Sequence, residues 1–173
     1  MKIASIHELK QELNIINISE LKELCLRLAK HKKDNKELLT YLLFEAHNEQ
    51  GYVEGVKNEM TEAFGDLPKS NLHLTKKSLR KLLRSISKYA RHTGSAQSQI
   101  EMLIHFCTLL KQSGIPFHKT TALENLYFQQ LKKIHTLLMS LHEDLRFDYT
   151  KEVNKLEEIE STRSRFVSWF KKS

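Results

Sequence analysis

The chain has little of the material from which sheets, tight turns and disulfide frameworks are built. Its 173 residues include 5 Gly, 2 Pro, 2 Cys and 1 Trp. So few glycines and prolines leave little turn chemistry for a fold of many short strands, and two cysteines are too few for a disulfide framework. The abundance of Leu, Lys and Glu favours helices instead. The composition therefore predicts an all-α protein.

Long apolar runs are also absent. No run approaches the roughly 18 residues that a membrane-spanning helix needs. The segment 1–5 lacks the apolar core of a signal peptide, because polar residues interrupt it from Ser5 onward. Cys25 and Cys107 fall among leucines and isoleucines at helical spacing, which is typical of reduced core thiols. We therefore expect a cytoplasmic protein without a transmembrane segment.

Catalytic and metal-binding motifs are missing as well. The sequence has no glycine-rich phosphate loop, no nucleophile elbow, and no Cys-x-x-Cys or His-Glu-x-x-His spacing. His135 and His142 would lie about 10 Å apart along a helix axis, too far for one zinc ion. Glu101 and His105, four residues apart, are better explained as a buried, hydrogen-bonded polar pair. We expect no enzymatic activity, no cofactor and no metal.

Helix starts are marked by three capping-box patterns, at Ser5/Glu8, Asp34/Glu37 and Thr121/Glu124. The helix predicted over 95–112 is apolar over most of its circumference, which places it at the centre of a bundle with Leu103, Ile104 and Cys107 innermost. The fold predicted is a bundle or HEAT-like stack of about six helices with a long C-terminal helix. We expect one helical domain over residues 1–160 and a basic, aromatic tail over 161–173.

The long C-terminal helix carries a heptad pattern of leucine and isoleucine. Its apolar residues from Leu131 to Leu145 repeat at alternating spacings of three and four. Such spacing indicates packing of one helix on another, either within the monomer or across a homodimer.

The most informative feature is a local excess of positive charge. Between Leu67 and Ile100 there is no Asp or Glu, and the helix predicted over 75–92 separates its apolar residues from its basic ones on a helical wheel. Like charges four residues apart on one helix repel each other, so something outside the helix should offset them. The candidate contact residues are Lys76, Lys77, Arg80, Lys81, Arg84, Lys88 and Arg91.

Three sources could supply the opposite charge. The acidic segment 34–66, which directly precedes the basic helix, could neutralise it internally. A nucleic-acid backbone could do so, because residues 77–91 span roughly 20 Å of helix. An acidic protein or an anionic membrane is the third source. We expect a non-enzymatic binding module that contacts phosphates, possibly those of nucleic acid. The alternative is a protein–protein interaction scaffold whose basic face is neutralised by 34–66.

Two resemblances add to this interpretation. The segment 37–44, which reads ELLTYLLF between a leucine-rich helix and a basic helical half, resembles small uncharacterised bacterial helical proteins. That resemblance implies an all-helical fold and no particular activity. Residues 6–31 are similar to a SAP-type helix-loop-helix that binds DNA, although they lack the glycines that such a module has in its turn.

Overall fold

The computed structural model describes residues 3–157, and this part of the chain contains eight α-helices and no strand, which confirms the all-α prediction. Its contacts divide the chain after His47 into two compact units, 1–47 and 48–173. This division was not among the expectations from the sequence, so each unit is described by itself. The predicted tail over 161–173 lies outside the described residues.

The first unit holds three helices, α1 (Ile6–Ile15), α2 (Ile18–His31) and α3 (Lys33–Thr40). The predicted capping box at the start of α1 is confirmed, because Ser5 and Glu8 each bind the other's backbone N–H. The predicted cap at Asp34 is wrong, since α3 begins one residue earlier, after the extended residue Lys32. The Asn35 amide instead donates to the Leu28 carbonyl at 2.9 Å, which ties α3 to the end of α2.

The helices of the first unit have apolar side chains but hardly any core. Tyr41 is the one residue classed as buried between residues 3 and 47. The more strongly exposed apolar side chains of this unit include Ile6, Ile15, Ile18, Leu26, Leu28, Leu42, Leu43 and Phe44. A short π-helical turn (Tyr41–Glu45) and a 3-10 turn (Ala46–Asn48) end the unit and lead into the next helix.

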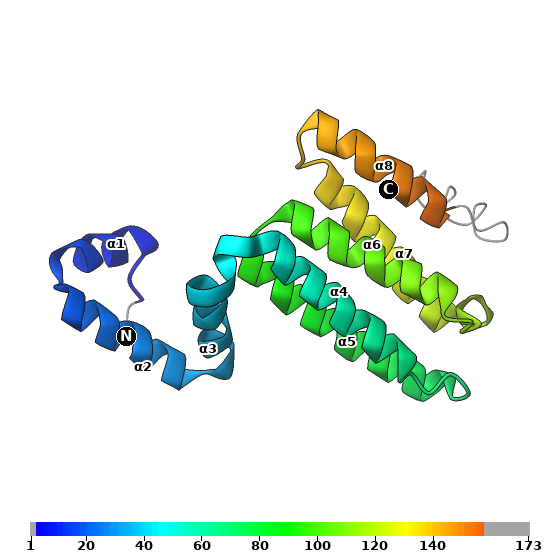
Figure 1. The fold of residues 1–173 in the computed structure, drawn as a ribbon, viewed down its shortest axis with the longest axis horizontal. Helices are drawn as coiled ribbons and strands as arrows, with labels where there is room; N and C mark the ends of the chain where they lie inside the picture. The colour runs from blue at the N-terminus through cyan, green and yellow to red at the C-terminus, as the bar shows by residue number, and fades with distance from the viewer. Residues whose placement is uncertain (1–2, 158–173) are drawn as a thin grey trace. The chain divides into compact units, whose positions relative to one another are not determined.

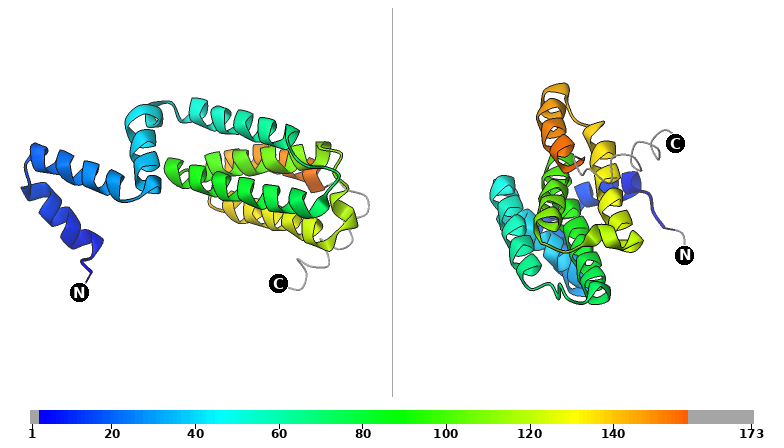
Figure 2. Two further views of the ribbon diagram at one scale, coloured as in Figure 1. Left: turned by 90° about the horizontal axis from the view of Figure 1, so that it is seen from below. Right: turned by 90° about the vertical axis from the view of Figure 1, so that its right-hand side faces the viewer.

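The second unit is a five-helix bundle built around α6. Its helices are α4 (Glu49–Gly65), α5 (Leu72–Thr93), α6 (Ala96–Gln112), α7 (Thr121–Leu138) and α8 (Glu143–Glu157), with a 3-10 turn (Phe117–Lys119) before α7. Helix α6 packs against all four others (Figures 1 and 2). Leu103, Ile104 and Cys107 are buried on it, as its nearly continuous apolar surface predicted.

The predicted long C-terminal helix is two helices joined by a turn over 139–142. The Arg146 guanidinium stabilises this turn: its Nε donates to the Leu138 carbonyl and its Nη2 to the Leu141 carbonyl. The Leu138 carbonyl, at the end of α7, also accepts a hydrogen bond from the Leu141 N–H, and Arg146 adds donors where intrahelical ones run out. Leu131 and Ile134 of the heptad are fully buried within the bundle.

No helix between residues 3 and 157 has the combination of length and apolar character that a bilayer crossing requires.

Candidate functional site

The basic helix is α5, and local signals define both its ends. Asn71 precedes it and accepts hydrogen bonds from the backbone N–H groups of His73 and Leu74, so the helix begins three residues before the expected start. It ends at Gly94, whose φ of 65° lies in the left-handed region that favours glycine. The apolar face of α5, including Leu79 and Ile86, is buried in the bundle.

The seven candidate cations lie on the opposite face of α5. We call this set the cationic face. Five of its members are exposed, and two, Lys76 and Lys88, are half-buried. Toward the start of the helix, basic side chains of α5 alone border a shallow, open concavity of about 560 Å³. The lining residues are His73, Lys76, Lys77, Arg80 and Arg84.

The ion pairs of the described residues do not involve most of this face. Between residues 48 and 157, none joins a carboxylate to Lys76, Lys77, Arg80, Lys81, Arg84 or Arg91. Nor do the acids of the neighbouring helix α4 reach these six side chains. Glu54 pairs with Lys57, Glu59 accepts a hydrogen bond from the Tyr89 hydroxyl, and Glu49 accepts one from Ser98.

Helix α7 adds residues to this side of the bundle that the sequence did not single out. A groove of about 340 Å³ lies between α5 and α7, lined by Arg80, Leu83, Ala122, Asn125, Leu126, Gln129 and Gln130. Farther along, burial lowers the pKa of Lys133, and the positive charge of Arg91 lowers it further. Helices α5 and α7 are separated in the sequence by α6, so these amides and Lys133 come to lie beside α5 only in the folded bundle. No local sequence pattern identifies them as part of this surface.

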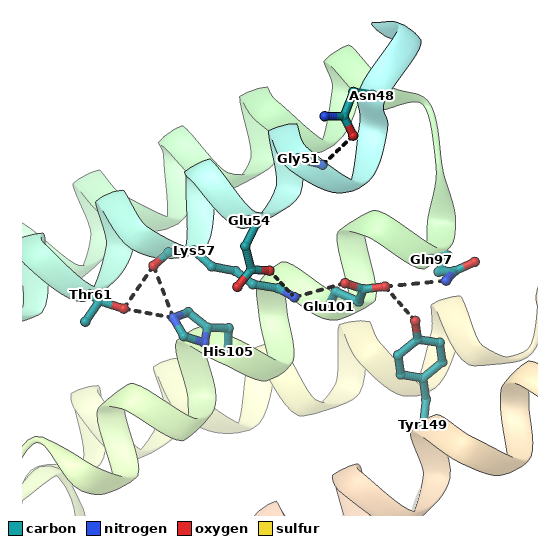
Figure 3. Close-up of polar contacts among 9 residues, drawn as sticks. All are labelled: Asn48, Gly51, Glu54, Lys57, Thr61, Gln97, Glu101, His105 and Tyr149. Carbon is teal, nitrogen blue, oxygen red and sulfur yellow. Dashed lines mark hydrogen bonds and ion pairs between the residues drawn. The ribbon is translucent and has the colours of Figure 1, made fainter. Parts of the chain in front are cut away.

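A separate polar network ties α4, α6 and α8 together (Figure 3). The Glu101 carboxylate lies 3.0 Å from Lys57 Nζ and accepts a hydrogen bond from the Tyr149 hydroxyl at 2.7 Å. His105 does not pair with Glu101. Its Nε2 lies 3.1 Å from the Lys57 carbonyl and 3.0 Å from Thr61 Oγ1. The predicted hydrogen-bonded pair of Glu101 and His105 is therefore wrong, because each side chain binds α4 instead of the other.

These contacts explain the titration of the network. Burial raises the pKa of Glu101, but the hydrogen bonds from Tyr149 and Lys57 and the charge of Lys57 outweigh it, so the net shift is downward. Burial lowers the pKa of Lys57, and the bond to Glu101 reverses this to a net rise. Burial also lowers the pKa of His105, which favours its neutral form. Because every member has a partner, the network is a structural joint between helices.

The remaining histidines do not assemble a metal site in the described part of the chain. His135 pairs with Glu157 at 2.5 Å, and His142 lies 3.4 Å from Asp144 in an exposed position. Among residues 3–157, no group of three or more His, Cys, Asp and Glu side chains could hold a metal ion.

Comparisons with protein-family models, with curated proteins and with solved structures found no match to this chain. The resemblances noted from the sequence therefore stay predictions. The function is inferred from the charge and shape of the chain's own surface.

Proposed function

We propose that the second unit is a non-enzymatic binding module whose cationic face contacts the phosphates of nucleic acid. One observation carries this proposal: a helix face of seven cations, five of them exposed, in which six form no ion pair with any carboxylate of residues 48–157. Phosphate oxygens supply the negative charge that this face lacks, and binding them releases counterions from the nucleic acid.

The acids of α4 favour an external anion over internal neutralisation. Glu54 and Glu59 are directed toward Lys57 and Tyr89, not toward the candidate cations. The basic concavity at the start of α5 likewise has no carboxylate in its lining. A phosphate placed there would meet several cations at once, as backbone-binding surfaces provide.

The test is fluorescence anisotropy of the full chain with labelled DNA and RNA at about 50 and about 200 mM salt. Four or five phosphate contacts give a salt slope of about −4 to −5, so affinity should fall by about 10²- to 10³-fold between the two conditions. Absence of binding at micromolar protein, or binding that ignores salt, would overturn the proposal.

A charge-matched pair of variants locates the contact. R80E/R84E reverses two exposed cations of the cationic face, and K151E/K155E reverses two exposed cations of α8 at the same spacing. Both change the net charge equally. We expect the first to abolish binding and the second to weaken it by less than about threefold, since charges beyond a Debye length are screened. Equal losses would mean that net charge, not this face, attracts the ligand.

A second candidate function is a protein–protein interaction scaffold, and the first unit favours it. Its exposed apolar side chains, such as Leu26, Leu43 and Phe44, are of the kind found where proteins meet. The homodimer predicted through residues 131–145 is less favoured, because Leu131 and Ile134 are already buried inside the bundle. Sedimentation over a range of protein concentrations tests self-association. A monomer at all concentrations, unchanged by L43E, would count against this candidate.

A further inference from the structure

The groove between α5 and α7 joins basic, amide and apolar groups in one recess. Arg80 lines both this groove and the basic concavity, so the two surfaces are continuous. Leu83 and Leu126 provide apolar lining, and Asn125 and Gln129 provide amides. The basic concavity provides positive charge without amides, whereas the groove combines positive charge with amide and apolar groups.

Basic side chains of α5 and α7 lie beside the groove along its length. Helices α5 and α7 run in the same direction, because each is antiparallel to α6, which follows one and precedes the other (Figure 1). Arg80 therefore lies level with the first half of α7, and Arg91 lies close enough to the second half to lower the pKa of Lys133. A strand whose phosphates follow α5 would pass beside the groove.

The amides are placed to form hydrogen bonds with a ligand. Asn125 and Gln129 are four residues apart on one face of α7, and both are exposed. Each primary amide offers two donors and an acceptor, the combination that pairs with the edge of a nucleobase. Gln130, beside them, donates to the Leu126 carbonyl at 3.1 Å, which holds its side chain along the helix.

The position of these amides beside a groove, and not on a protruding ridge, selects the kind of nucleic acid. In a duplex the base edges lie at the bottom of a groove, and a protein reads them with a protruding helix or ribbon. In a single strand a base can leave the stack and enter a pocket in the protein. Leu83 and Leu126 would contact the face of such a base, while the amides would meet its edge.

We propose that the groove between α5 and α7 receives an unstacked base of a single-stranded nucleic acid and that Asn125 and Gln129 read its edge. This inference depends on the proposed function, because the phosphates on the cationic face would bring the base to the groove. The ligand class is single-stranded DNA or RNA with a base preference, and adenine is the base whose edge Asn and Gln match best.

The test measures binding of the full chain to labelled homopolymers of adenine, cytosine and thymine deoxynucleotides, each about 12 nucleotides long. A well-formed amide–base pair should give about a 5- to 100-fold preference for one base. N125L/Q129M removes both amides but keeps the branched or linear shape of each side chain, and it should reduce the preference to about twofold while leaving the salt slope unchanged. The control Q112M/N154L changes two exposed amides elsewhere and should keep the preference.

A second variant tests the groove without changing either amide, so that a loss of preference does not depend on one double substitution that could disturb folding. A122L narrows the groove at an exposed position and leaves both amides in place, so it too should remove the preference. Salt-dependent binding of every homopolymer with equal affinity would overturn this inference and leave the proposed function intact. Tighter binding of duplex than of any single strand would also overturn it. No binding to any nucleic acid would instead overturn the proposed function on which it depends.

Discussion

Lys57 Nζ lies 3.0 Å from a carboxylate oxygen of Glu101, and this pair joins α4 to the central helix of the bundle. Both side chains are about four-fifths shielded from solvent, whereas Glu54, the second acid beside Lys57, is mostly exposed. A shielded pair that is also hydrogen-bonded contributes more to stability than an exposed one. Substitution of the exposed Glu54 therefore serves as the control for substitution of the shielded Glu101.

The substitution Glu101→Gln should destabilise the protein by about 1–2 kcal/mol at pH 7, measured by urea unfolding. Because folding lowers the pKa of Glu101, the unfolded chain binds more protons between the native pKa and about 4.3. The carboxylate's contribution is thus present above the unfolded pKa and is lost as the pH falls through the native one. The gap between wild type and E101Q should shrink below about pH 4. E54Q should cost less than about 0.5 kcal/mol, and an equal cost would contradict this account.

Tyr127 offers a test of a buried hydrogen bond between distant segments. Its hydroxyl donates to the Leu156 carbonyl at 2.8 Å and links α7 to the end of α8. Tyr127→Phe removes this buried donor, so we expect a loss of about 0.5–1.5 kcal/mol in the free energy of unfolding. Tyr89→Phe removes a bond at the surface and should cost less. A silent Y127F variant would mean that another donor replaces the hydroxyl.

The turn between α7 and α8 should depend on Arg146. Arg146→Met keeps most of the apolar stem but removes the donors to the Leu138 and Leu141 carbonyls. We expect a loss of about 1–3 kcal/mol in thermal or urea unfolding, since two hydrogen bonds from a charged guanidinium are lost. The Leu138 carbonyl keeps the bond that it accepts from the Leu141 N–H. Lys155→Met, on an exposed part of the same helix, is the control and should change stability by less than about 0.5 kcal/mol. Unchanged stability of R146M would show that water satisfies these carbonyls.

The core around α6 should respond strongly to a cavity. Leu103 is 1% exposed, and Leu103→Ala should destabilise the bundle by about 2–5 kcal/mol. Met139, in the turn after α7, is 75% exposed, so Met139→Ala should be nearly neutral. Calorimetric unfolding of both variants measures the difference. Similar unfolding temperatures would contradict the central position of α6.

The charge reversal R80E/R84E carries a stability prediction of its own. It replaces repelling pairs on α5 by attractive ones, including Lys76 with residue 80 and Lys88 with residue 84, each a few tenths of a kcal/mol better. Helicity by circular dichroism and urea unfolding should therefore show equal or slightly higher stability. If these arginines neutralise acids of the same chain, stability will fall instead.

Much of the fold follows from local patterns. The cap formed by Ser5 and Glu8 was predicted correctly, and the end of α5 near His92 and the start of α6 near Ser95 were predicted to within one residue, because each depends on backbone geometry within a few residues. The break after Leu138 was missed, since the heptad spacing continues through it and the stabilising Arg146 lies eight residues away. The caps predicted at Asp34 and Thr121 are both wrong, since α3 begins after Lys32 and α7 after Thr120, and neither of these two residues caps its helix with its side chain.

For the candidate site, the sequence determined the cationic face, because the spacing of Lys77, Arg84 and the other basic residues along one helix fixes which side they share. It also determined that α6 is central, since its apolar surface must be covered on several sides. The tertiary structure alone decided that Glu101 pairs with Lys57 and that Asn125 and Gln129 stand beside Arg80. Helical periodicity determines neighbours within a turn or two, whereas neighbours on different helices depend on how whole faces pack together.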